Sequence, residues 1–379
     1  MSNVSSFYID DHSITEYEAY LNKQIITYIG NKRNLLNFIG DGLSKVQSRL
    51  SKNKLDIFDV FSGSGIVSRY LKKYSNRLIV NDLEKYSEII NHCYLSNKSE
   101  INMNKMYDIY RDIIFKVEND PLKIGFITEL YSPNNENKIQ PDDRVFYTKR
   151  NAMYIDTARQ YIEGISEEYK DYFLAPLLSE ASIHANTSGV FKGFYKDSNK
   201  GIGKFGGNNG DALRRILGNI HLPFPVFSNY ECEIEIHRGD SNIIAECIDE
   251  VDIAYLDPPY NQHPYGSNYF MLNLISNYIK PTQISKVSGI PTDWNRSNYN
   301  KRVRAKDSFR ELASKINAKY LLISFNSEGF INLSEMVDIL EKIGSVEVLE
   351  TKYNTFRGSR NLRNRDIHVR EYLYLVERK

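Results

Sequence analysis

The sequence has few cysteines, no long apolar run and almost no surplus of charge. Its three cysteines among 379 residues, Cys93, Cys232 and Cys247, are odd in number and lack metal-ligand spacing. This predicts buried or half-buried reduced thiols rather than disulfides or zinc ligands. No apolar stretch approaches the roughly 20 residues that a membrane span requires, and residues 1–11 lack the basic and then apolar pattern of a secretory signal. We therefore expect a soluble, cytoplasmic protein with no membrane partner.

The formal net charge of only +1 argues against a uniformly basic protein, but it conceals two local clusters of bases. Between residues 296 and 310 the bases face one acid, Asp307, and between residues 352 and 370 they face Asp366. Both clusters are typical of loops that follow nucleic-acid phosphates, and a solvated charged loop is the alternative for each. The bases are Arg296, Lys301, Arg302, Arg304, Lys306 and Arg310 in the first cluster and Lys352, Arg357, Arg360, Arg363, Arg365 and Arg370 in the second.

The length exceeds the roughly 250 to 300 residues at which single cores stop growing, which predicts two domains. Strand patterns alternate with helical patterns near both ends of the chain, whereas residues 101–230 mix helical and polar segments. We therefore expect a catalytic domain made of residues 1–100 and 231–379, interrupted by an inserted, mainly helical region over 101–230.

Two segments of this insert, residues 144–148 and 183–195, combine aromatic and basic side chains with hydroxyl or amide groups. The second also contains two glycines. It suits a loop that contacts base edges or phosphates, and equally a hairpin packed under the catalytic sheet. Further glycines between residues 201 and 210 predict a mobile loop before Leu213.

The tetrapeptide Asp257-Pro258-Pro259-Tyr260 follows an apolar run, Val251–Leu256, that predicts a buried strand ending at the first proline. Two successive prolines restrict the turn, so Asp257, the Pro258 carbonyl and the Tyr260 ring form one rigid unit. A carboxylate and a carbonyl can accept both hydrogens of an exocyclic amine while a tyrosine stacks on the ring that bears it. An ordinary strand-ending turn is the alternative.

A strand, a glycine turn and a helix are predicted over residues 55–74, with Phe61-Ser62-Gly63-Ser64-Gly65 as the turn. The turn lacks the third glycine of the dinucleotide fingerprint and the Gly-Lys-Ser/Thr ending of a P-loop. Asp82 ends the next predicted strand, about 20 residues beyond the turn, where an acid typically binds a ribose diol. Together these features favour an adenosine-containing ligand other than a dinucleotide or ATP.

The segment Tyr28-Ile29-Gly30-Asn31-Lys32 precedes apolar residues at helical spacing and predicts a turn that leads into an amphipathic helix. Gly30 would let another molecule approach the backbone. Lys32 would place a positive charge near a helix start, where an anion is favoured. A helix cap with solvated bases is the alternative.

The remaining strand patterns complete the fold prediction. Glu233–His237 alternates as a strand does and is followed by Gly239-Asp240, so Asp240 would face the same crevice as Asp82. Later strands are predicted at residues 319–325, 346–349 and 372–376. The sequence therefore predicts an α/β protein with about seven strands in a mostly parallel sheet.

These motifs, in this order, resemble one family. The chain resembles the S-adenosylmethionine-dependent DNA adenine-N6 methyltransferases, specifically the group related to DNA adenine methylase in restriction–modification systems. Ser324–Gly329 is also similar to a segment of type IIS modification methylases. The motifs cover scattered parts of the two outer thirds of the chain. The resemblance implies a Rossmann-like methyltransferase fold in which residues 101–230 recognise the target sequence.

The resemblance also implies roles for the motif residues. Asp82 would hold the cofactor's ribose and Asp240 would contact its adenine end. Asp257 and the Pro258 carbonyl would hold the target amine in line with the sulfonium methyl, while Tyr260 stacks on a base turned out of the duplex. No metal is needed, because the donor is already activated. The implied cofactor contacts are Tyr28, Gly30, Lys32, Phe61, Ser62, Gly63, Gly65, Asp82, Asp240 and Asp257, and the implied catalytic residues are Asp257, Pro258, Pro259 and Tyr260.

The implied partners are double-stranded DNA and a cognate restriction endonuclease, and we expect a monomer. Two other functions are alternatives. An RNA adenine methyltransferase is one, since ribosomal RNA enzymes carry a similar tetrapeptide, although compact RNA enzymes rarely have a separate base-reading domain. A non-catalytic nucleic-acid binder with an inactive methylase fold is the other, and the intact residues 257–260 argue against it.

Overall fold

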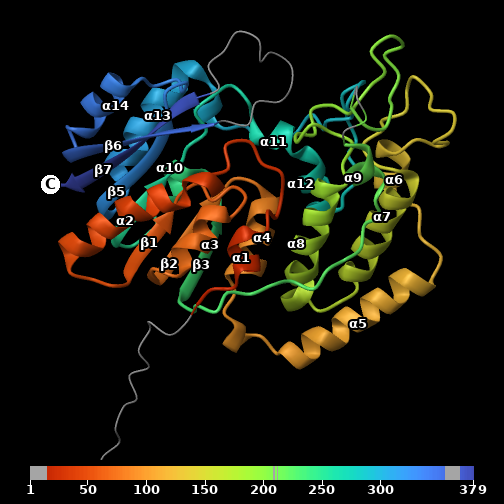
Figure 1. Ribbon diagram of the computed structural model, residues 1–379, viewed down its shortest axis with the longest axis horizontal. Helices are drawn as coiled ribbons and strands as arrows, with labels where there is room; N and C mark the ends of the chain where they lie inside the picture. Colours follow the sequence, from red (N-terminus) through yellow and green to blue (C-terminus); the bar gives the residue numbers. More distant parts are fainter. Residues whose placement is uncertain (1–14, 208–209, 211, 355–367) are drawn as a thin grey trace, which may run out of the picture.

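A seven-stranded sheet and a group of helices beside it make up the computed structural model, which describes residues 15–207, 210, 212–354 and 368–379 (Figure 1). The strand order is β3-β2-β1-β4-β5-β7-β6. The pairings are parallel except those of β7, which runs antiparallel to β5 and β6. The strands are β1 Leu55–Asp59, β2 Ser75–Asp82, β3 Glu233–Arg238, β4 Val251–Leu256, β5 Ala318–Asn326, β6 Gly344–Asn354 and β7 His368–Arg378.

The helices form two groups. Against the faces of the sheet pack α2 Leu36–Leu50, α3 Ile66–Lys72, α10 Ser241–Ile244, α13 Arg302–Lys315 and α14 Leu333–Leu340. The group beside the sheet, with the helices that join it, comprises α1 Glu18–Asn22, α4 Lys85–Leu95, α5 Met103–Asn119, α6 Phe126–Tyr131, α7 Lys149–Glu163, α8 Glu167–Ile183, α9 Leu213–Leu217, α11 Tyr265–Asn268 and α12 Phe270–Asn277. Short 3₁₀ turns are η2 Arg33–Leu35, η3 Lys98–Glu100 and η4 Asn298–Asn300.

Both faces of the sheet are buried, which explains why its central strands are apolar without interruption. Ile57 of β1 and Ile253 of β4 pack with α2 and α3 on one face. Their neighbours Phe58 and Ala254 pack with α13 and α14 on the other. Side chains alternate across a strand, so a strand covered on both sides must be apolar at every position. The predicted mostly parallel sheet in an α/β fold is confirmed.

A third hydrophobic core holds the group of helices together. It contains Ile155 and Leu177 from the region predicted as an insert, and also Ile89 of α4 and Met271 of α12 from outside that region. In Figure 1 α12 accordingly lies next to α8, between the sheet and the helices α6 and α7. The division of the chain at residues 100 and 230 stays a prediction.

The strand order places the ends of four strands where a ligand site is expected. From β1 the chain moves to β2 and β3 in one direction, whereas β4 and β5 lie on the other side of β1. A crevice forms at such a reversal, outside the carboxyl ends of the strands. The glycine turn after β1, Asp82, Gly239-Asp240 and Asp257 all lie at this edge of the sheet.

The structure tests the predictions for the three cysteines and for a membrane span. All three cysteines are free thiols, and Cys93 and Cys232 are buried. The prediction of a buried or half-buried thiol is wrong for Cys247, which is exposed because it lies in the short connection between α10 and β4. Within the described ranges no helix combines the length and apolar content needed to cross a bilayer.

Candidate active site

A pocket with about 870 Å³ of empty space opens at the carboxyl edge of the sheet. It is lined by ten residues that the sequence had singled out, Tyr28, Gly30, Lys32, Phe61, Ser62, Gly63, Asp82, Asp240, Asp257 and Pro259. Asp82 and Asp257 therefore open into one cavity, with the glycine turn between them. Gly65, Pro258 and Tyr260 are not among the lining residues.

The glycine turn has a backbone that only glycine adopts easily. Gly63 has a φ of 54°, and a Cβ on it would lie 2.9 Å from the ring of Tyr28. Its N–H donates to Asp82 at 2.8 Å, which ties the turn to the end of β2. Gly65 has a φ of 72°, and its Cβ would meet Asn91 at 2.8 Å. Gly63 therefore shapes the pocket wall directly, whereas Gly65 shapes it through the turn.

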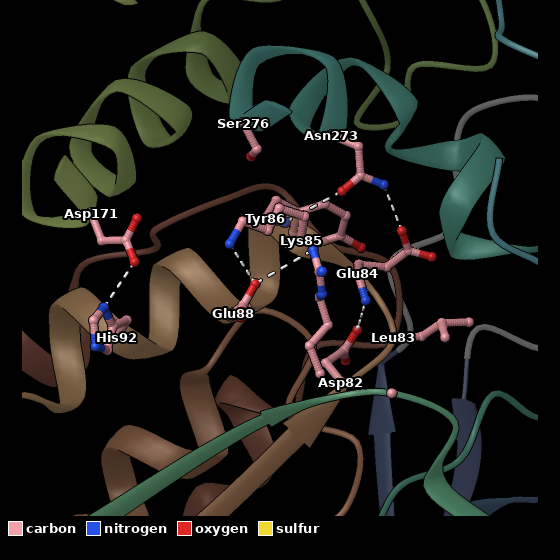
Figure 2. Close-up of polar contacts among 12 residues, drawn as sticks. Asp82, Leu83, Glu84, Lys85, Tyr86, Glu88, His92, Asp171, Asn273 and Ser276 are labelled. Carbon is pink, nitrogen blue, oxygen red and sulfur yellow. Dashed lines mark hydrogen bonds and ion pairs between the residues drawn. The ribbon is translucent and has the colours of Figure 1, made fainter. Parts of the chain in front are cut away.

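A half-buried carboxylate, Asp82, and a buried one, Glu84, lie at the end of β2. Asp82 accepts hydrogen bonds from the N–H groups of Gly63 at 2.8 Å and Glu84 at 2.9 Å. Glu84, whose side chain is only 3% exposed, accepts from Asn295 at 3.0 Å and from Asn273 of α12. Figure 2 shows Asn273 reaching Glu84 from the helix above it. Burial raises the pKa of Asp82 to about 6 and that of Glu84 to about 7.

Lys32 lies at the opposite end of the pocket and is enclosed by two acids. Its ammonium is 3.1 Å from Asp257 Oδ1 and 2.9 Å from Glu371 Oε1, and it is 1% exposed. Burial alone would lower its pKa, but the two carboxylates raise it well above the usual value. The prediction that Lys32 offers a free positive charge to an anion is therefore wrong, and so is the alternative that Lys32 is a solvated base. The charge of Lys32 is already balanced inside the protein.

Asp257 follows β4 directly and is held at the pocket wall by the two prolines after it. Burial raises its pKa to about 7, the ion pair with Lys32 opposes the rise, and Glu371 adds to it. Only a small part of its side chain is exposed, and that part lines the pocket. The carboxylate therefore faces the pocket with one oxygen beside a buried cation.

Tyrosines join the segment before α2 to the segment after Asp257. The ring of Tyr28 stacks on Tyr265 at 4.9 Å and on Tyr269 at 4.7 Å between centroids. The hydroxyl of Tyr265 donates to the Ile29 carbonyl at 3.0 Å, and the Ile29 N–H donates to Tyr269 at 2.7 Å. This clamp places Lys32 beside Asp257, although the two are far apart in the sequence.

Tyr260 follows the two prolines, and it does not line the pocket. Its ring packs against Phe325 at 5.6 Å between centroids, and the Lys32 ammonium lies 5.2 Å from the ring centre. It also limits the space at Gly30, where a Cβ would lie 3.1 Å from its hydroxyl. Gly30 is therefore required by the packing of tyrosines.

Several lining residues were not predicted from the sequence. They are Ile66, Val67, Leu83, Glu84, Ser241, Tyr255, Tyr265, Gly266, Asn295, Ser297 and Asn300. Four other lining residues, Asn31, Ser64, Asn81 and Gly239, lie within or next to the predicted motifs but had no role assigned to them. Tyr265 and Tyr269 were detectable as two aromatic residues four positions apart, shortly after the tetrapeptide. Asn295, Ser297 and Asn300 carried no signal, because they lie in a loop without periodicity.

The first basic cluster is mostly helical, so its description as a loop was wrong. Residues 302–310 lie on α13, because Ala305, Phe309 and Leu312 form a buried stripe at helical spacing. Lys306 pairs with Glu335 at 2.7 Å and Arg310 with Asp307 at 2.8 Å. The other bases of this cluster are exposed or partly exposed. In the second cluster, Arg357, Arg360, Arg363 and Arg365 lie outside the described residues.

The segment 183–195 packs on the helical core and not under the sheet. Phe191 is buried in that core, and its N–H donates to Asn268 of α11 at 2.7 Å. Asn186 is fully buried and bonds to the backbone of Val145 and Lys204, so it cannot contact a base. The hairpin alternative under the sheet is therefore wrong, and only exposed members of the segment can face a partner.

The strand order, the glycine turn and the acid-lined pocket together define a Rossmann-like methyltransferase. Comparison with known proteins makes this specific. The sequence model of the D12 class N6 adenine-specific DNA methyltransferases matches residues 28–339, and the chain belongs to this family. It is accordingly an adenine-specific DNA methyltransferase, and the alternatives of an RNA enzyme and of a non-catalytic binder gain no support.

Curated relatives agree over nearly the whole chain. The chain is 28% identical to the type II methyltransferase M.NlaIII of Neisseria lactamica over 361 residues, which cover 93% of this chain and 99% of the relative. It is 30% identical to the type II methyltransferase M.CviAII of Paramecium bursaria Chlorella virus 1, at 93% and 98% coverage. It is 27% identical to the type II methyltransferase M.FokI of Planomicrobium okeanokoites, of which it covers 52%. The predicted resemblance is confirmed.

Proposed function

We propose that the pocket binds S-adenosylmethionine and that Asp257 holds the N6 amine of an adenine turned out of duplex DNA. The observation that supports this most directly is the single cavity shared by Asp82 and Asp257, with the glycine turn between them. One side of such a cavity can hold a nucleoside while the other presents an acceptor to the target base. Two separate surfaces would have left no route for direct transfer.

The charge of the pocket suits this cofactor better than a phosphate-bearing nucleotide. Among the described residues, its charged lining consists of four acids, Asp82, Glu84, Asp240 and Asp257, and one base, Lys32, which is already paired with two acids. Phosphates would be repelled by this excess of carboxylates. A ligand with a ribose diol, an ammonium and a sulfonium is attracted, and when bound it supplies a methyl group already activated for transfer.

The residues divide between the two halves of the pocket. Asp82 and Glu84 offer carboxylate oxygens for the two ribose hydroxyls, and charge-assisted hydrogen bonds of this kind are among the strongest in proteins. Asp240 caps α10 by accepting from the Asn242 N–H at 2.9 Å, which fixes it at the end assigned to the adenine ring. Tyr28 and Gly63 border the region assigned to the methionine part.

At the reacting end Asp257 would accept one hydrogen of the amine and the Pro258 carbonyl the other. Accepting both hydrogens draws the nitrogen lone pair out of the ring and aims it along the transfer direction. The rigid turn holds both acceptors before the base arrives, so little reorganisation is needed. We retain Tyr260 as the stacking residue because it follows these acceptors directly.

We further propose that residues 101–230 form the target-recognition region. Lys192, Lys196 and Arg214 are exposed there, and the backbone bond from Phe191 to Asn268 joins this segment to the helix that follows the catalytic turn. Exposed bases on α13 would add phosphate contacts. A region placed in this way can position a recognised sequence so that its adenine reaches the pocket.

The proposal is tested with tritiated cofactor on assorted duplex DNA that is afterwards digested to nucleosides. All label should appear as N6-methyladenine, and single-stranded DNA and ribosomal RNA serve as comparison substrates. Label on cytosine alone, or transfer to RNA but not to DNA, would refute the proposed chemistry.

The names of the relatives, type II methyltransferases, support a role in a restriction–modification system. We propose that the methyl mark protects DNA from a cognate endonuclease, and that the enzyme acts as a cytoplasmic monomer. Sequencing the methylated genome of an expressing host would give the recognition sequence. DNA that is cut by nucleases specific for that sequence despite full methylation would contradict a protective role, and a larger mass in light scattering would contradict a monomer.

A further inference from the structure

Glu371 is an acid in the active-site network that belongs to none of the recognised motifs. It lies on β7, opposite Asn326 of β5, and is fully buried. Its Oε1 accepts from the Ser324 hydroxyl at 2.6 Å and from the Lys32 ammonium at 2.9 Å. It lies beyond residue 339, where the family match ends. Its position next to Lys32 therefore arises from the three-dimensional fold and not from a local motif.

Lys32 consequently bridges two carboxylates that come from strands on either side of β5. One of them, Asp257, reaches the pocket, whereas Glu371 lies behind Lys32 and does not line the pocket. A buried ion pair seldom gains net stability over apolar residues of the same volume, since both charges lose their hydration. Stability alone thus gives no sufficient reason for two buried acids on one buried lysine.

We propose that Glu371 is a positioning residue of the methyl transfer, which holds Lys32 at a fixed distance from Asp257 and takes up part of its charge. The inference rests on the proposed function, because it concerns how Asp257 is presented to the amine. With Glu371 in place, Lys32 neutralises Asp257 only in part, so the carboxylate keeps its strength as an acceptor. Ser324 and the β5–β7 pairing hold Glu371 itself.

This arrangement has a consequence for pH that packing alone would not have. Lys32 lowers the pKa of Asp257 and Glu371 raises it, in each case by direct charge interaction. If Glu371 is made neutral, Lys32 acts on Asp257 alone and the Asp257 pKa falls. Activity that requires the carboxylate is lost as pH drops through this pKa. The acid limb of the rate profile must therefore move to lower pH when the charge of Glu371 is removed.

Within the described part of the chain, the other titratable groups that face Asp257 do not change this sign. Burial raises the pKa values of Tyr255 and Tyr265 well above their usual value, so both stay neutral throughout the assay. Burial also raises the pKa of Asp59 to about 7, but Asp59 is present in the wild type and in every variant, so its effect is the same in all of them. Tyr260, which lies near Lys32, is likewise the same residue in the wild type and in the variants. The difference between variant and wild type thus isolates the effect of Glu371.

The test uses Glu371→Gln and Glu371→Asp in the full chain, with Glu350→Gln as the control. Glu350 lies on the neighbouring strand β6, is 41% exposed and pairs with Arg370 at 3.2 Å. Single-turnover rates with saturating cofactor and duplex DNA are measured from about pH 5.5 to 9, and cofactor affinity is measured by calorimetry.

For Glu371→Gln we expect a rate at least about tenfold lower at high pH, because the amine acceptor is misplaced. Cofactor affinity should stay within about twofold and the acid limb should lie at lower pH. Glu371→Asp keeps the charge on a shorter side chain, so its limb should fall between those of wild type and Glu371→Gln. Glu350→Gln should match the wild type in rate and in pH profile.

If Glu371→Gln changes neither the rate nor the acid limb of the pH–rate profile, the inference is overturned. A lower rate with the acid limb at the same pH would also overturn it, because that result indicates a loss of packing alone. If Glu371→Gln does not fold, the test rests on Glu371→Asp. An acid limb at the same pH as in the wild type then overturns the inference, and an acid limb at lower pH supports it. Wild-type protein that leaves no label on adenine would instead refute the proposed function. The two failures are therefore distinguishable.

Discussion

Replacing Lys32 by methionine should destabilise the protein strongly, and by an amount that depends on pH. Methionine fills a similar volume but leaves Asp257 and Glu371 facing each other without a cation between them. Lys32 is 1% exposed and Glu371 is not exposed, so water cannot restore the lost interaction. Removing one partner of such a buried network typically costs about 3 to 5 kcal/mol. We expect a loss in this range at pH 8.

The loss should diminish as the pH falls. Without Lys32 the folded-state pKa of Asp257 rises further above its unfolded value, because burial already raises it to about 7 and Lys32 opposes that rise. The folded state then binds more protons than the unfolded state between the unfolded pKa near about 4 and the folded pKa, so its stability decreases with rising pH over that window. At about pH 5.5 protonation of one acid lets it donate to the other, and much of the stability returns.

The measurement is urea unfolding followed by circular dichroism at both pH values. Lys45→Met serves as the control, because Lys45 pairs with Glu347 at 2.8 Å on the surface and is 41% exposed. Exposed pairs contribute at most about 1 kcal/mol, so this variant should change little at either pH. Equal losses in the two variants, or a Lys32→Met loss that does not vary with pH, would refute the buried-network reasoning.

Three further predictions concern the pocket. Asp257→Ala should keep cofactor affinity but abolish methyl transfer, because its amine contact matters chiefly in the reacting geometry; calorimetry and labelled DNA test this, and retained turnover contradicts it. Gly63→Ala should lower stability by about 1 to 2 kcal/mol through its positive φ and the Tyr28 contact, whereas Gly193→Ala, where a Cβ meets nothing within 4 Å, should be close to neutral in the same unfolding assay. Glu84→Gln should weaken cofactor binding by about 1.5 to 3 kcal/mol, because it removes a charged acceptor. Cofactor binding by the wild type should weaken below about pH 7, where Glu84 becomes protonated. Equal cofactor affinities of wild type and Glu84→Gln in calorimetry would exclude a contact with Glu84.

The sequence allowed prediction of those parts of the fold and site that have a local signature. The strand before Asp257, the glycine turn and the acid at the end of β2 each consist of a few adjacent residues whose backbone preferences act together. Their meeting at one sheet edge followed from the rule that parallel strands end on the same side. For this reason Asp82, Gly63 and Asp257 could be predicted to share a pocket without knowledge of the tertiary structure.

The rest depends on contacts between distant segments. The pairing of Lys32 with Glu371 joins residues 339 positions apart, and no periodicity links them. Glu84 was not singled out from the sequence, because the residues that enclose it, Asn273 and Asn295, are distant in the chain. The helical character of residues 302–310 was hidden by their high charge, although Ala305 and Phe309 have helical spacing. Such errors arise because charge is evident in a sequence, whereas the partner that neutralises it is not.

The long separation between Lys32 and Glu371 also bears on how the enzyme loses activity. Since β7 supplies one end of the network and the segment before α2 supplies the other, detachment of either segment would disconnect the reacting centre. Chemistry and cooperative folding are thereby coupled, so a chain in which either segment has detached should lose methyl transfer. Catalytic competence should consequently be lost when either segment opens, even while the helical core beside the sheet stays folded.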